Sequence, residues 1–154
     1  MTLRSLILPC VFVALVAGTA LATDPPLTQV APEALVERLD DGATAPYVLD
    51  VRTAEEFVAG HVPGAVNIPH DQIPARLAEV PKDRDVVLYC RSGRRAVLAG
   101  EVLADNGYAR LEHLQGDMLG WVEQGRPVEK PRDAAACLAA LTSGKPAEQA
   151  CASN

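Results

Sequence analysis

The run that begins at Cys90 carries the residues best suited to chemistry. Cys90 is followed directly by Arg91, Ser92, Gly93, Arg94 and Arg95. A thiolate is a much better nucleophile than a thiol, and cationic groups nearby favour the thiolate. Three arginines close to one cysteine therefore predict an ionised sulfur that attacks an anionic substrate.

The segments on either side of this run predict how Cys90 is positioned. Residues 85–89 form an apolar, β-branched run typical of a buried strand, and residues 94–106 have helical spacing. A loop between a strand and a helix N-terminus points backbone N–H groups and the positive end of the helix dipole inward. Gly93 lets this backbone fold closely around a sulfur atom. We therefore expect a small anion-binding loop.

The first residues have the pattern of a secretory signal peptide. Arg4 precedes an apolar run over residues 6–17, and Ala20 and Ala22 stand in the arrangement that signal peptidase recognises. We expect removal of residues 1–22, a periplasmic or secreted product and no membrane contact after cleavage. A membrane anchor is the alternative, although the apolar run is short for a membrane span.

The cysteine count changes when the signal is removed, because Cys10 is lost with it. Cys90, Cys137 and Cys151 remain, and an oxidising compartment favours pairing. Cys137 and Cys151 are close together near the C-terminus, so we expect them to form a disulfide that leaves Cys90 free. A structural bridge is the simpler interpretation, and a redox pair that acts on Cys90 is the alternative.

Composition and charge exclude several other classes of protein. The chain has 154 residues, which suits one domain, and its net charge is −6. An acidic protein is a poor general nucleic-acid binder, so the basic run after Cys90 suits a small anion. The three histidines, at His61, His70 and His113, are scattered, and the cysteines lack ligand spacing. We expect no metal site and no cofactor.

Strand-like and helical segments alternate along the chain. Strands are predicted over residues 47–51, 65–68, 85–89 and 111–114, and helices over 32–39, 55–59, 72–79, 94–106 and 118–123. This alternation predicts an α/β domain with a mainly parallel central sheet flanked by helices. Ligands bind such sheets beyond the carboxyl ends of the strands, where Cys90 lies. Asp50 and Arg52 follow a neighbouring strand, so they form either a structural salt bridge or an ion pair that positions the loop from behind.

Three segments resemble the rhodanese family. Residues 50–69 resemble the signature near the N-terminus of rhodanese domains, residues 89–96 resemble their active-site loop, and residues 114–121 resemble their closing Gly-Trp motif. Order and spacing agree, so we expect a single rhodanese-like domain over residues 23–131. Asp117 replaces a glycine that is usual in the family, which we expect to alter that turn slightly.

The C-terminal extension, residues 132–154, lies outside the family pattern. Residues 133–141 are rich in alanine and predict a helix, and residues 148–152 predict a last turn. We expect the cysteine pair described above to staple these two short elements, because they have little apolar surface of their own.

The resemblance implies a thiosulfate sulfurtransferase. Cys90 would take a sulfur atom from a small anionic donor as a persulfide and pass it to cyanide or a thiol acceptor. The implied substrate-binding residues are Arg91, Ser92, Gly93, Arg94 and Arg95, with Arg91 either binding the substrate or facing solvent. A slow or non-catalytic sulfur-carrier or anion-binding module that serves a partner protein is the alternative. We expect a monomer.

The spacing after Cys90 also separates sulfur transfer from phosphate chemistry. Cysteine-dependent phosphatases need an arginine six positions after the cysteine, to grip a tetrahedral phosphate in a wider loop. That position is Ala96 here, and Arg95 falls one residue short. The loop is therefore expected to be sized for a sulfur atom.

Overall fold

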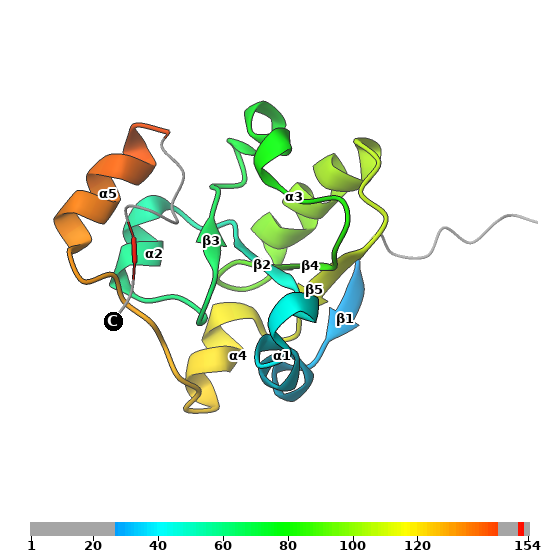
Figure 1. Ribbon diagram of the computed structural model, residues 1–154, viewed down its shortest axis with the longest axis horizontal. Coiled ribbons are helices and arrows are strands. Elements are labelled where there is room, and N and C mark those ends of the chain that lie inside the picture. The colour runs from blue at the N-terminus through cyan, green and yellow to red at the C-terminus, as the bar shows by residue number, and fades with distance from the viewer. Residues whose placement is uncertain (1–26, 145–150, 153–154) are drawn as a thin grey trace, which may run out of the picture.

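A single sheet of five parallel strands organises the part of the chain that the computed structural model describes, residues 27–144 and 151–152 (Figure 1). Its strands, in spatial order, are β1 (Thr28–Val30), β5 (Leu111–Leu114), β4 (Val86–Tyr89), β2 (Tyr47–Asp50) and β3 (Val66–Asn67). The predicted α/β fold is confirmed. The predicted signal peptide and most of the turn predicted over residues 148–152 lie outside the described residues. No helix within the described ranges has the length and apolar character to cross a bilayer.

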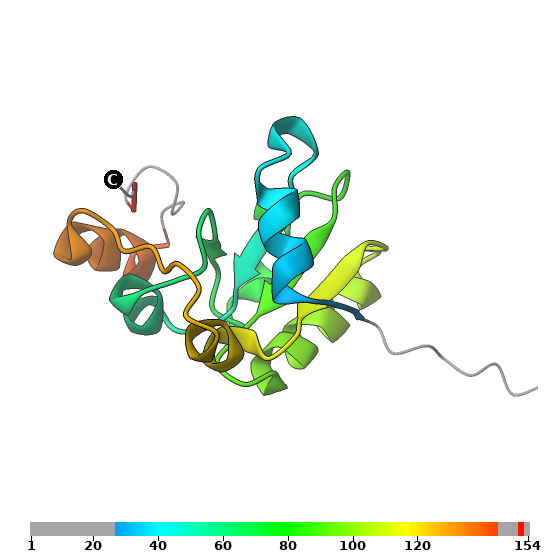
Figure 2. The same cartoon turned by 90° about the horizontal axis from the view of Figure 1, so that it is seen from below.

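Helices cover both faces of the sheet. The central strand β4 is therefore buried along its whole length. On one face, α3 (Arg94–Asp105) packs its residue Leu103 into the core. On the other face, α1 (Pro32–Leu39) and α4 (Asp117–Glu123) pack around the buried Trp121 (Figure 2). The carboxyl end of β4 therefore opens between two helical layers, and Cys90 is the next residue.

The segment predicted as a helix over residues 72–79 forms two 3-10 turns instead, at Ile73–Ala75 and Leu77–Glu79. The prediction of a continuous helix is therefore wrong. Pro74 disfavours the helical conformation at the residue before it, and Pro81 ends the segment. A stretch this short between two prolines is too short for a stable α-helix, so i→i+3 bonds form.

The first strand is an element that the sequence did not predict. In β1, Thr28 and Gln29 are exposed and only Val30 is buried, so the segment carries no clear strand pattern. Its conformation depends on pairing with β5, where Gln29 lies opposite His113. Another short element, the 3-10 turn Gly42–Thr44, precedes β2.

The C-terminal extension packs against α2 (Ala54–Ala59), beyond the β3 edge of the sheet (Figures 1 and 2). Its helix α5 (Ala134–Thr142) buries Cys137 and Leu141 in a separate apolar cluster with Phe57 of α2. A disulfide joins Cys137 to Cys151, which is the pair that the sequence predicts. The extension therefore supports α2, the helix on one side of the Cys90 loop.

Candidate active site

The loop after β4 folds around the sulfur of Cys90. The backbone N–H of Gly93 donates a hydrogen bond to Cys90 Sγ at 3.1 Å. Gly93 has a φ of 102°, and a Cβ at this position would lie 3.3 Å from a carboxylate oxygen of Asp117. Both the left-handed backbone and the close approach favour glycine here. Cys90 is a free thiol and only 2% exposed, so its sulfur lies at the base of the loop, below an exposed Ser92.

The three arginines of the loop have different surroundings. Arg95 is half-buried and donates two hydrogen bonds to the Glu56 carboxylate, at 2.6 and 2.9 Å. Glu56 chiefly, and the sulfur of Cys90 to a smaller extent, raise the pKa of Arg95. Arg91 and Arg94 are exposed, and neither forms an ion pair within the described part of the chain. Two of the three arginines are therefore available to an anion, and the third is tied to α2.

Glu56 is held in place by the N-terminus of α2. Thr53 Oγ1 accepts a hydrogen bond from the Glu56 N–H at 3.3 Å, and the Glu56 carboxylate accepts one from the Thr53 N–H at 3.1 Å. This reciprocal capping box fixes the start of the helix. The hydrogen bond from Arg95 is the main reason that the pKa of Glu56 is lowered to about 2. Glu56 is thus ionised at neutral pH and links α2 to the loop.

A buried ion pair lies behind the loop at the end of β2. Arg52 donates hydrogen bonds to both carboxylate oxygens of Asp50, at 2.6 to 3.0 Å. The Tyr89 hydroxyl donates to the same carboxylate at 2.7 Å and accepts from the Val62 N–H at 3.1 Å. Burial, reinforced by the charge of Asp50, raises the pKa of Tyr89 well above its usual value. These contacts fix the last residue of β4, which directly precedes Cys90.

A second buried pair lies beneath the loop, and the sequence did not predict it. Asp117 Oδ1 accepts the backbone N–H of Cys90 at 2.8 Å, and His113 Nε2 lies 3.1 Å from Asp117 Oδ2. His113, one of the three scattered histidines of the sequence, therefore has a buried carboxylate partner. Asp117 has a φ of 53°, which is uncommon for a residue other than glycine. The available sequence signal was the aspartate at a position where the family usually has glycine.

The remaining histidine near the site has a structural role. His61 stacks on Phe57 with ring centroids 3.8 Å apart, and its Nδ1 lies 3.0 Å from the Phe57 carbonyl oxygen. Burial lowers the pKa of His61 and favours its neutral form. Across residues 27–144 and 151–152, no three histidine, cysteine or acidic side chains gather in a way that would hold a metal ion.

The chain belongs to the rhodanese family, because the model of the rhodanese-like domain matches residues 31–124. It is 39% identical to a sulfurtransferase of Allochromatium vinosum over 105 residues, which are 68% of this chain and 97% of that protein. It is also 39% identical to the thiosulfate sulfurtransferase PspE of Escherichia coli over 74 residues, 47% of this chain and 71% of that protein. These relatives support a sulfurtransferase role.

Solved structures agree with the family assignment. A rhodanese-related protein from Thermoplasma volcanium has a TM-score of 0.59 and 27% identity, over 66% of this chain and 96% of that one. The Alr3790 protein from Anabaena has a TM-score of 0.63 and 26% identity, over 75% of this chain and 94% of that one. The expected rhodanese fold is confirmed.

Removal of the Asp117 carboxylate is expected to destabilise the fold. Asp117→Ala leaves the buried N–H of Cys90 without its acceptor, which should lower the free energy of unfolding by about 1–3 kcal/mol. Asp117→Asn keeps one acceptor oxygen and should lose less. Urea denaturation of the two variants measures the difference. Equal losses would contradict the role of this side chain as the acceptor for Cys90.

The Glu56–Arg95 ion pair predicts a specific acid sensitivity. The pKa of Glu56 falls from 4.5 to about 2 on folding, so the pair stabilises the fold above about pH 4.5 and loses its effect as the pH falls toward 2. Glu56→Gln should therefore have a lower unfolding free energy than the native chain at neutral pH, and this difference should disappear in acid. Glu101→Gln, at an exposed position of α3, is the control and should follow the native chain. A difference that stays constant down to about pH 2 would rule the ion pair out.

Proposed function

We propose that the protein transfers a sulfur atom from a small anionic donor, such as thiosulfate, to a thiophilic acceptor through a persulfide on Cys90. The observation that carries the proposal is the thiol of Cys90, which accepts a hydrogen bond from the Gly93 N–H at the base of a loop that carries two exposed arginines, Arg91 and Arg94. The sulfurtransferase relatives support the same class of reaction.

In the first step, the Cys90 thiolate attacks the outer sulfur of thiosulfate. A bond forms between the two sulfur atoms, the sulfur–sulfur bond of thiosulfate breaks, and its electron pair leaves with sulfite. The Gly93 N–H and the N-terminus of α3 stabilise the negative charge on sulfur. Arg91 and Arg94 bind the sulfonate oxygens through charge-assisted hydrogen bonds, while Ser92 lies at the rim.

Arg95 acts differently from the direct substrate contact expected from the resemblance. Its guanidinium is held by Glu56 and lies near the Cys90 sulfur, so it contributes positive charge and fixes the loop. Asp50 and Arg52 position the loop from the end of β2.

In the second step, cyanide or a thiol attacks the outer sulfur of the persulfide. The bond between this sulfur and Cys90 breaks, and its electron pair returns to Cys90 as a thiolate. The cycle balances without a further oxidant or reductant. Donor and acceptor react in turn at one sulfur atom, so the loop needs to hold only one of them at a time.

We place this reaction in the periplasm or outside the cell. The signal-like residues 1–22 and the disulfide between Cys137 and Cys151 both fit an oxidising compartment. Both cysteines of the bridge are buried in an apolar cluster with residues of α2. This burial supports a structural disulfide over a redox pair that acts on Cys90.

Purified protein is expected to form thiocyanate from thiosulfate and cyanide. Thiosulfate alone should add one sulfur atom to the peptide that contains Cys90, and Cys90→Ser should abolish both results because it removes the nucleophile. Mass spectrometry and a thiocyanate assay provide the two measurements. The double variant Cys137→Ser/Cys151→Ser is the control and should still load sulfur. Loading without turnover would favour the carrier module, and no loading would exclude the proposed reaction.

Arg94→Ala is expected to raise the KM for thiosulfate by about tenfold or more, the size of effect from losing one charge-assisted hydrogen bond. Its unfolding free energy should stay close to that of the native chain, since Arg94 is exposed. Arg84→Ala removes an equal charge from an exposed position before β4 and should leave KM unchanged. Equal effects of the two variants on KM would show that only the overall charge matters.

A further inference from the structure

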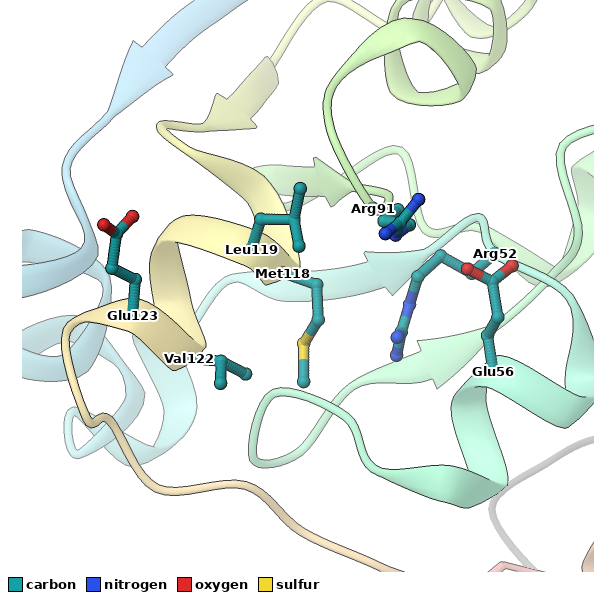
Figure 3. Close-up of a pocket in the computed structure, with 7 residues that line it drawn as sticks. All are labelled: Arg52, Glu56, Arg91, Met118, Leu119, Val122 and Glu123. Carbon is teal, nitrogen blue, oxygen red and sulfur yellow. The ribbon is translucent and has the colours of Figure 1, made fainter.

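A groove with a volume of about 550 Å³ runs along α4 beside the Cys90 loop (Figure 3). We call it the α4 groove; its lining residues are Arg52, Glu56, Arg91, Met118, Leu119, Val122 and Glu123. Figure 3 shows the apolar side chains of α4 along one side and the two arginines with Glu56 along the other. Thiosulfate would leave most of this volume empty, whereas the volume suits an organic molecule.

The groove adjoins the loop that follows Cys90. Arg91, which lines it, is the residue after Cys90. The Met118 N–H donates to the Cys90 carbonyl oxygen at 3.1 Å, and the Leu119 N–H donates to the Arg91 carbonyl oxygen at 3.2 Å. A persulfide adds a sulfur about 2 Å beyond Cys90 Sγ, which extends the reacting atom beyond the base of the loop.

The apolar side of the groove exposes side chains that the fold alone does not require there. Leu119 is 50% exposed and Val122 is 54% exposed, and they lie one turn apart on α4. Burial of such surface against a ligand stabilises a complex by about 25 cal/mol per Å². An inorganic donor does not cover this surface, whereas a hydrocarbon chain does.

The charges along the groove set the direction in which a ligand lies. Arg52 is paired with Asp50 and Glu56 with Arg95, whereas Arg91 forms no ion pair within the described residues. The available positive charge is therefore beside Cys90. At the α4 end, Glu123 disfavours a second anionic group. The complementary ligand has its anionic sulfur near Arg91 and an uncharged apolar body along α4.

We propose that the α4 groove binds the acceptor, and that this acceptor is an organic thiol with an apolar chain. The inference rests on the proposed sulfur transfer and names the acceptor class for it. The acceptor thiol gives its proton to the outer sulfur of the Cys90 persulfide, and the resulting thiolate attacks this sulfur. The sulfur–sulfur bond to Cys90 breaks, its electron pair stays on Cys90, and the product is the organic persulfide.

A series of straight-chain thiols tests this directly. Protein that carries the Cys90 persulfide after reaction with thiosulfate is mixed with ethanethiol, butanethiol or hexanethiol. These thiols have similar sulfur chemistry and differ in chain length. We expect kcat/KM for sulfur transfer to rise by about fourfold for each methylene that becomes buried, and so by more than about tenfold across the series. A series without this rise overturns the inference.

Two variants locate the effect. Leu119→Gln/Val122→Gln removes the apolar side of the groove and should flatten the dependence on chain length. Leu98→Gln changes an apolar residue of α3 that is 44% exposed and should keep the full dependence. All three positions are exposed, so the fold should tolerate the changes, which circular dichroism and urea denaturation check. Equal slopes in the groove and control variants overturn the inference.

A measurement without turnover separates this inference from the proposed function. Methane-, butane- and hexanesulfonate carry the same anionic head and are expected to bind more tightly with length, shifting the methyl NMR signals of Leu119 and Val122. Normal thiocyanate formation with no dependence on chain length in either series would overturn the inference that the α4 groove binds the acceptor. The proposed sulfurtransferase function would still stand. Failure of thiosulfate to transfer a sulfur atom to Cys90 would instead overturn the proposed function.

Discussion

The carboxylate of Asp50 holds together the ends of β2 and β4 at the carboxyl edge of the sheet. It is fully buried and accepts hydrogen bonds from Arg52 and Tyr89, while Arg52 also donates to the Gly60 carbonyl oxygen at 2.8 Å. Buried charges are tolerated only when they are paired and hydrogen-bonded, so these partners depend on one another. Tyr89, the last residue of β4, is therefore held in one position, and this places the backbone of Cys90, the next residue.

The loop that follows is held from two further directions. Arg95 binds Glu56 on α2, and the backbone N–H of Cys90 binds Asp117 at the start of α4. These contacts come from elements on opposite sides of the loop, and α2 is itself backed by the C-terminal extension. A loop fixed in this way keeps the Gly93 N–H aimed at the Cys90 sulfur without help from a ligand, which is the arrangement that efficient charge stabilisation needs.

The sequence predicted features that have local signals, and it missed features that depend on distant partners. The Cys90 loop, the alternation of strands and helices and the pairing of Cys137 with Cys151 follow from short segments or from the cysteine count. Asp117 and Arg95 acquire their roles only when the fold brings Cys90 and Glu56 to them. Polar side chains on separate elements have no periodic pattern, so their pairing was not predictable. The strand β1 was missed for the same reason, because β5 supplies its hydrogen bonds.

The depth of Cys90 has a consequence for its survival among oxidants. A thiol that is 2% exposed cannot easily meet a cysteine of another protein, because a protein disulfide carries a bulky backbone on each side of its sulfur atoms. Burial thus protects the free sulfhydryl of Cys90 from crosslinking two chains through a disulfide.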